Sequence, residues 1–246
     1  MGRQASLHQP AALLAALIIG AIATAALVAA PPVHTAEAIT DTVARFLESG
    51  RPPLLAYRAR RHLQASSRGG KLKAQLDAWT TLQPDGTFSF EVLQESGSSM
   101  IRQRILHAAL LEEQDNYRNE KLAESAFTRE NYEFLVDDTA RDDELIRIGL
   151  APRRKSQMLI SGAAFVRREN ADLVTIQGVL SKRPSFWTRK VQVTRHYARI
   201  GGVRVPIDVQ LKADVLLVGD STFAMTYQYA SINGRQIATP SVGDGF

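Results

Sequence analysis

Residues 203–218 read VRVPIDVQLKADVLLV. Apolar residues stand at every second position from Val203 to Leu217, and most residues between them are polar or charged. Alternation with a period of two places the two sets on opposite faces of a β-strand. A strand of this length with a single apolar face is typical of a large, curved antiparallel sheet. The preceding Gly201-Gly202 predicts a hairpin turn that joins this strand to residues 187–200.

The same alternation recurs on both sides of this hairpin. It predicts strands over residues 57–65, 72–82, 88–94, 156–168, 173–180 and 222–230, with turns at residues 84–87 and 169–172. Apolar residues at helical spacing predict a helix over residues 39–49, which ends at Gly50, and a second from Ser98 or Ser99 toward Lys121. A further short helix is expected from Thr128 to Leu135, followed by an acidic loop at residues 137–144.

These elements predict an α+β fold that is mainly β. We expect a strongly curved antiparallel sheet whose concave face is covered by helices at residues 39–49 and 98–135, because an apolar sheet face must be buried. Two helices are sparse cover for about eight long strands. Either the sheet closes into a barrel, or an open half-barrel keeps an apolar cavity beneath the helices.

The N-terminus predicts export. Arg3 precedes an apolar run over residues 11–30, which is followed by Pro31-Pro32 and by Ala36-Glu37-Ala38. This is the layout of a secretory signal peptide, so residues 1–38 are expected to be removed and the protein to be periplasmic. A retained N-terminal segment that tethers the protein to the inner membrane is the alternative. Residues 39–230 then form one domain, and residues 231–246 a flexible tail.

Composition excludes several kinds of chemistry. The 246 residues include 30 Lys and Arg, 25 Asp and Glu, and no cysteine, which excludes disulfides, thiolate metal sites and thiol nucleophiles. The basic residues are dispersed, so a nucleic-acid partner is not expected. His62, His107 and His196 have no metal-binding spacing, and the acidic loop lacks the donor pattern of a calcium site. We therefore expect no enzyme activity, metal or cofactor.

The order of elements resembles the LolA/LolB superfamily of periplasmic lipoprotein carriers, whose relatives include sigma-factor regulators and lipid-binding lipoproteins. The resemblance is greatest from Gly162 to Tyr229, where Arg195-His196-Tyr197 leads to Gly202-Val203-Arg204-Val205-Pro206. It implies an open half-barrel that holds acyl chains in an apolar cavity under a helical lid. It also implies an arginine near the cavity mouth that controls lid opening, with Arg58, Arg60 and Arg61 as candidates.

Two sets of residues are the candidate site. The alternation pattern assigns ten side chains to the concave face, as the lining of a lipid cavity or as plain core: Leu76, Phe88, Phe90, Val191, Val193, Tyr197, Val209, Leu211, Met225 and Tyr227. The lid and mouth are assigned to Arg58, Arg60, Ile101 and Ile105. Basic pairs such as Lys182-Arg183, beside Phe186-Trp187, are either ordinary solvated charges or a contact to an anionic membrane surface.

The leading hypothesis is therefore a periplasmic carrier whose partner is a lipid or an acylated lipoprotein. The alternative is a non-enzymatic protein-interaction or stress-sensor module on the same fold, with a fully packed sheet.

Overall fold

The computed structural model describes residues 34–137, 144–184, 188–215 and 219–238. The strands in these residues are β1 (Tyr57–Ser67), β2 (Leu72–Leu82), β3 (Phe88–Gly97), β4 (Tyr132–Asp137), β5 (Leu145–Pro152), β6 (Ile160–Arg167), β7 (Leu173–Leu180), β8 (Thr188–Ile200), β9 (Val203–Val215), β10 (Gly219–Ile232) and β11 (Arg235–Gln236). The helical elements are α1 (His34–Glu48), α2 (Ser99–Ile101), the π-helical η2 (Arg102–His107), α3 (Ala108–Arg118) and the 3-10 helix η3 (Lys121–Ser125).

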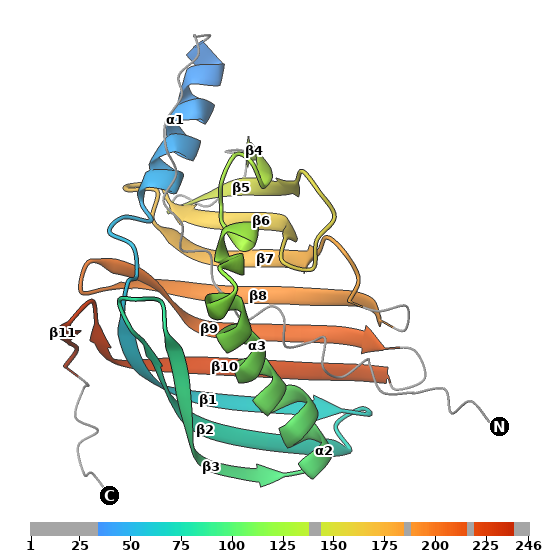
Figure 1. Cartoon of the computed structure of the whole chain (residues 1–246). Helices are drawn as coiled ribbons and strands as arrows, with labels where there is room; N and C mark the ends of the chain where they lie inside the picture. The colour runs from blue at the N-terminus through green and yellow to red at the C-terminus, as the bar shows by residue number, and fades with distance from the viewer. Residues whose placement is uncertain (1–33, 138–143, 185–187, 216–218, 239–246) are drawn as a thin grey trace, which may run out of the picture.

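All of these strands belong to one antiparallel sheet, in the order β3-β2-β1-β10-β9-β8-β7-β6-β5-β4, with β11 paired to β10. β3 and β4 are the two edges, so the sheet built from the described residues is not closed into a barrel. Figure 1 shows the strands stacked from one edge to the other. The predicted mainly β, open and curved sheet is confirmed, and the barrel is not formed.

The two faces of the sheet differ as the alternation predicts. In β1, Tyr57 and Leu63 are buried, whereas Arg58 and Gln64 on the opposite side are exposed. We call the first side the covered face and the second the outer face. The buried apolar side chains form one continuous cluster that reaches from edge strand β3 to edge strand β4.

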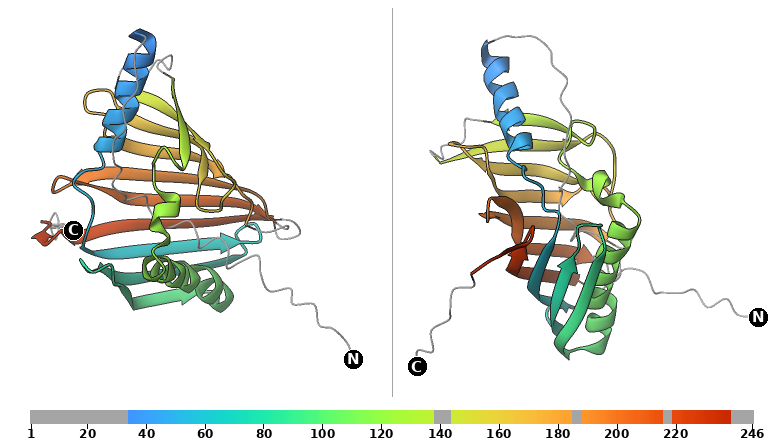
Figure 2. Two further views of the ribbon diagram at one scale, coloured as in Figure 1. Left: turned by 45° about the horizontal axis from the view of Figure 1, so that its top comes forward. Right: turned by 60° about the vertical axis from the view of Figure 1, so that its left-hand side comes forward.

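Helices lie over the covered face at two places. α2, η2 and α3 follow one another without a break along β1–β3, and we call residues 99–118 the cover helix (Figure 1). α1 lies at the other side of the molecule, where it packs against β4 (Figure 2). Its Val43 and Phe46 are three residues apart and both buried, because this spacing brings them to one side of a helix. Helices therefore cover the concave face, as predicted.

The short helix predicted at residues 128–135 is wrong. Residues 132–137 form β4, which pairs with β5 from Tyr132↔Pro152 to Asp137↔Arg147. Tyr132 is buried and Leu135 is exposed, which fits a strand with one buried side. A segment this short carries too few apolar positions for its period to be assigned, so the pairing with β5 decides its structure.

A bulge changes the alternation within β9. His196 of β8 pairs with Asp208, but the next residue, Tyr197, pairs with Pro206, so Ile207 is an extra residue in β9. One added residue exchanges the faces of every side chain beyond it. Val203 and Val205 therefore lie on the other face of the sheet from Val209. The prediction that all apolar residues from 203 to 217 share one face is wrong.

Both ends of the chain lie partly outside the described residues. α1 begins at His34, within the expected signal segment, and residues 1–33 lie outside the described residues. No helix in the described part of the chain is long and apolar enough to cross a membrane. β10 continues to Ile232 and β11 pairs with it, so the first residues of the expected tail lie in the sheet. Residues 138–143 of the acidic loop and Phe186-Trp187 also lie outside the described residues.

Candidate functional site

The ten side chains assigned to the concave face come together in the core. They lie on β2, β3, β8, β9 and β10, and Phe90 is half-buried while the other nine are buried. Pairs such as Val193↔Leu211 and Leu63↔Met225 lie directly opposite each other on neighbouring strands. In this conformation the ten residues are packed against other side chains, so their role as a ligand lining stays a prediction.

Arg195 of β8 and Arg61 are arginines that share this face, and Arg61 is the one that lies beneath the cover helix. It belongs to β1, four residues after Tyr57 and two before Leu63, so the alternation directs its side chain beneath the cover helix. It is among the largest fully buried side chains of the described residues. A buried guanidinium is strongly unfavourable unless its charge and its donors are satisfied. The chain must therefore supply an anion on the covered face.

Glu113 of α3 supplies this anion. The guanidinium of Arg61 donates to both carboxylate oxygens, with 2.9 Å between Nη2 and Oε1, and also to the hydroxyl of Tyr57. Leu106 and Leu110 precede Glu113 at spacings of seven and three residues and are fully buried, so all three point from the cover helix toward the sheet. This bidentate pair is a direct polar link between the cover helix and β1.

Aromatic rings surround the pair. The guanidinium carbon of Arg61 lies 4.6 Å from the ring centre of Tyr227 and 5.5 Å from that of Phe88, which are cation–π distances. Burial alone would lower the pKa of Arg61, but the carboxylate of Glu113 raises it well above its ordinary value. Burial also raises the pKa of Tyr57 far above 10, although Arg61 opposes this shift. The site therefore holds a permanent cation beside neutral phenols.

The structure places the expected mouth residues at different positions. Arg58 lies over the ring of Trp79, 4.7 Å from its centre, and Arg60 lies 3.8 Å from Asp77, both on the outer face. Of the three candidate arginines, Arg61 is the one that lies beneath the cover helix. Ile101 and Ile105 are buried on the side of the cover helix that faces the sheet.

The signals for Arg61 and Glu113 were present in the sequence. Arg61 has the same parity as Tyr57 and Leu63, and Glu113 lies in the apolar stripe of its helix with Leu106 and Leu110. A charged residue within an apolar stripe on each of two facing elements is the pattern that predicts a buried ion pair. The pairing itself depends on how the helix is placed on the sheet, which the sequence pattern does not specify.

A second polar link fixes the start of the cover helix. Glu95 of edge strand β3 pairs with Arg102, and its other oxygen lies 2.6 Å from Nε2 of His107. The hydrogen bond from His107 lowers the pKa of Glu95, with the charge of Arg102 adding to this effect and partial burial opposing it. Both partners belong to η2, a π-helical turn, and such turns are often found at functional sites.

The end of α1 is fixed by arginines of the sheet. Arg199 of β8 donates to both oxygens of Asp172, at 2.7 and 2.8 Å, and to the backbone oxygens of Ser49 and Gly202. Arg204 donates to the Ser49 hydroxyl, and its burial lowers its pKa. These bonds satisfy carbonyl groups that the helix end leaves without partners.

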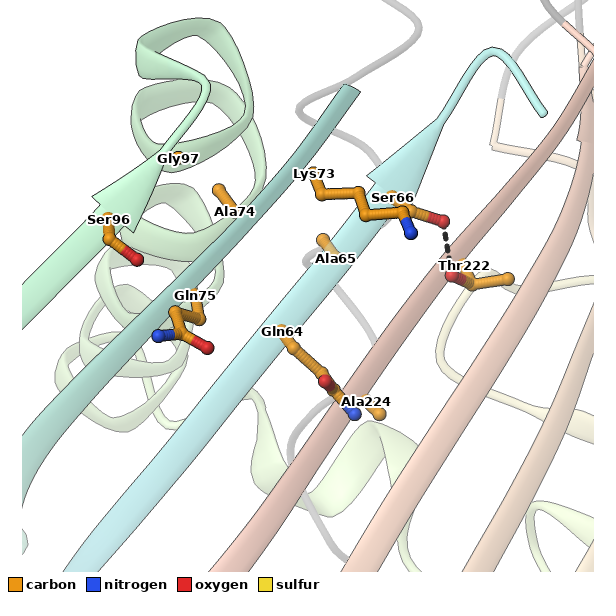
Figure 3. Close-up of a pocket in the computed structure, with 10 residues that line it drawn as sticks. All are labelled: Gln64, Ala65, Ser66, Lys73, Ala74, Gln75, Ser96, Gly97, Thr222 and Ala224. Atoms are coloured by element: carbon orange, nitrogen blue, oxygen red, sulfur yellow. Dashed lines mark hydrogen bonds between the residues drawn. The ribbon is translucent and has the colours of Figure 1, made fainter. Parts of the chain in front are cut away.

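Two open grooves lie away from the cover helix. The first, of about 480 Å³, is on the outer face, where Gln64, Gln75 and Lys73 project from β1 and β2 and Ser66 is hydrogen-bonded to Thr222 (Figure 3). The second, of about 460 Å³, lies between the end of β5 and the end of β7 and is lined by Arg153, Arg154 and Lys155. Neither groove includes any of the ten assigned side chains.

Each described histidine of the expected mature domain contacts a single carboxylate. His62 lies 3.2 Å from Asp77, and His196 lies 2.9 Å from Asp208, both on the outer face. Within the described residues, no three His, Asp or Glu side chains form a group that could hold a metal ion.

Comparison with known proteins finds distant structural similarity. The sequence matches no family model. It also matches no curated protein. Among solved structures, it is similar to a LolA superfamily protein from Nitrosomonas europaea. The two are 10% identical with a TM-score of 0.42, over 82% of this chain and 94% of that one. The superfamily that the sequence resembles is thus represented among the matched structures.

Two other matched structures are a DUF1329 family protein from Desulfovibrio piger and the MucA/MucB complex of Pseudomonas aeruginosa. The first is 10% identical with a TM-score of 0.41, over 84% of this chain and 93% of that one. The second is 10% identical with a TM-score of 0.21, over 82% of this chain and 100% of the matched one.

Proposed function

We propose that the protein is an exported binding protein that holds a lipid, or the acyl chains of a lipoprotein, between the covered face and the cover helix. The observation that carries this proposal is the buried pair of Arg61 and Glu113, which fixes the helix over an apolar sheet face. The sequence resemblance implies an arginine near the cavity mouth that controls lid opening, and Arg61 is one of its three candidates. The signal-peptide layout of residues 1–38 supports export.

Uptake requires the cover helix to move, because the side chains beneath it are already packed. Separating a buried ion pair costs about 3–5 kcal/mol when one partner is left uncompensated. Each buried methylene contributes about 0.8 kcal/mol, so an acyl chain of about 14 carbons contributes on the order of 10 kcal/mol. The binding of one chain is therefore sufficient to offset the loss of the pair, and the empty protein stays closed.

Native mass spectrometry of protein purified from a periplasmic extract tests the binding step. We expect a mass increase that disappears after organic extraction, and uptake of added palmitate or diacyl phospholipid by the extracted protein. The measurement should be repeated on the Arg61→Met/Glu113→Met double variant, in which the ion pair between β1 and the cover helix is absent. An apo mass together with no uptake by either protein would contradict the proposal.

A distance measurement tests the movement. Leu111 on α3 and Leu135 on β4 are both exposed, and the chain has no cysteine, so Leu111→Cys and Leu135→Cys allow two spin labels without further changes. We expect the distribution of distances between the labels to change when palmitate is added. An unchanged distribution in a sample that has taken up palmitate would contradict the lid mechanism but not the binding.

The edges of the sheet favour a second candidate function, a protein-interaction module. β3 and β4 are each paired on one side only within the described residues, and Leu93 of β3 and Leu135 of β4 are exposed. An open edge of this kind can pair with an extended segment of another protein. Failure of lipid uptake in the experiments above would favour this candidate.

A further inference from the structure

One end of the sheet carries a concentration of positive charge. Because the sheet is antiparallel, the segments that follow β1, β5 and β7 lie at the same end (Figure 1). Seven exposed basic residues lie in these segments: Arg68, Lys71, Arg153, Arg154, Lys155, Lys182 and Arg183. We call them the basic end. At the opposite end, the turn between β2 and β3 carries Asp85, and the turn between β6 and β7 carries Glu169 beside Arg168.

The basic end is not neutralised by other residues that the structure describes. Within the described part of the chain, no ion pair joins any of the seven to a carboxylate. Glu130 is close enough to Arg153 for this charge to lower its pKa, but the hydrogen bond from Thr128 is the larger cause. The charges are therefore available to an external anion.

Two of the arginines are held in place by hydrogen bonds to neighbouring residues. Arg153 donates from Nε to the oxygen of Arg129 at 2.8 Å, and Arg154 donates to Asn131 Oδ1 at 2.5 Å. Together with Lys155 they line the groove of about 460 Å³ described above. A side chain that is already oriented loses less conformational entropy when it binds an anion. The guanidinium groups also retain donors with the fork geometry that suits phosphate oxygens.

The width of the basic end identifies the partner. Six strand spacings separate β1 from β5, which is roughly 29 Å at the usual interstrand distance. A single small anion would contact one part of this array, whereas a bilayer surface presents many phosphates in one plane. We propose that the basic end is a binding surface for anionic phospholipid bilayers. The proposal is independent of acyl-chain binding beneath the cover helix.

Sedimentation with vesicles tests this proposal on the full mature protein. We expect binding to vesicles of equimolar phosphatidylglycerol and phosphatidylcholine, no binding to pure phosphatidylcholine, and a loss of binding as salt screens the charges. The variant for comparison is Lys155→Gln/Lys182→Gln/Arg183→Gln, because none of these side chains is hydrogen-bonded in the structure. Each cation near an anionic surface changes the partition coefficient about fivefold, so we expect a loss of about 100-fold.

A matched variant separates position from net charge. Arg60→Gln/Arg167→Gln/Arg235→Gln removes three exposed cations that lie outside the basic end, and it should bind vesicles like the unmodified protein. Equal losses in the two triple variants would overturn the proposal, as would no binding to the anionic vesicles. If millimolar inorganic phosphate displaced the protein fully from the vesicles, the bilayer proposal would be overturned. The groove lined by residues 153–155 would then be assigned to free phosphate.

Two further measurements keep the result interpretable. Circular dichroism and thermal unfolding should be the same for both triple variants and the unmodified protein, since all six side chains are exposed. Palmitate uptake by native mass spectrometry should also be unchanged in both. A protein that takes up palmitate but ignores anionic vesicles would overturn the bilayer proposal and leave the proposed function intact.

Discussion

Arg61 on β1 and Glu113 on α3 form an ion pair in which the two side chains are only 1% and 4% exposed. The pair lies among apolar and aromatic side chains of the covered face, and the hydroxyl of Tyr57 accepts a further hydrogen bond from the guanidinium. A pair of this kind adds little to stability compared with apolar residues of the same size, because both charges lose their hydration. Its effect is to specify where the cover helix lies on the sheet.

The first prediction concerns the cost of breaking this pair. Glu113→Ala leaves the charge of Arg61 buried without a partner, and we expect a loss of about 3–5 kcal/mol in the free energy of unfolding. Urea unfolding followed by circular dichroism measures this. The double variant Arg61→Met/Glu113→Met should be close to the unmodified protein, within about 1 kcal/mol, because neither charge remains. A double variant that is less stable than Glu113→Ala would contradict this account.

The alternation of apolar residues was sufficient to predict most of the sheet. The strands predicted at residues 57–65 and 72–82 follow directly from it, because each has one buried and one solvated face. β4 was missed because Tyr132 to Asp137 is short and its apolar residues fit either period. The bulge at Ile207 was missed because it depends on the pairing with Tyr197 of β8, which is not a local property of β9.

The candidate site was predicted only in part. The alternation correctly predicted that Val193, Leu211 and Met225 lie on one face. Arg61 was not distinguished from Arg58 and Arg60, although its alternation with Tyr57 and Leu63 places it on the covered face. Glu113 was missed because the contact between helix and sheet is tertiary, and a sequence pattern for one element does not specify its partner.

The second prediction concerns a close approach between β6 and β7. Gly162 pairs with Gly178, and a Cβ at Gly162 would lie 2.1 Å from the backbone oxygen of Gln177. We expect Gly162→Ala to lower the free energy of unfolding by about 3 kcal/mol, because backbone atoms must move. Gly86→Ala is the control: its φ of +84° carries strain, but nothing lies within 4 Å, so about 1 kcal/mol is expected. Equal losses would contradict the steric explanation.

The third prediction concerns the anchoring of α1. Arg199→Lys keeps a charge near Asp172 but loses the forked hydrogen bonds to it and to the oxygen of Ser49. We expect a loss of about 2 kcal/mol and faster hydrogen exchange at the amides of residues 42–48. Arg118→Lys, in an exposed pair with Asp115, should change stability by less than about 0.5 kcal/mol. Exchange in residues 42–48 that is unaffected by Arg199→Lys would show that other contacts hold the helix.

The fourth prediction concerns pH and the start of the cover helix. The pKa of Glu95 is lowered in the folded protein, mainly by its hydrogen bond with His107. A carboxyl group with a lowered folded-state pKa stabilises the fold above its ordinary pKa, near 4.5, and this stabilisation is lost as the pH falls through the lower folded-state value. We therefore expect the amides of residues 100–107 to lose protection from hydrogen exchange as the pH falls below about 4.5.

The variant Glu95→Gln identifies the group responsible. Glutamine cannot be ionised, so the protection of residues 100–107 in this variant should already be reduced at neutral pH and should change less between neutral and acidic pH. The pair of Arg61 and Glu113 lies further along the cover helix, so the amides of residues 109–116 provide an internal reference in the same samples. If Glu95→Gln kept the full pH dependence of the unmodified protein at residues 100–107, another acidic group would be responsible, and the link between β3 and η2 would have no part in holding the helix closed.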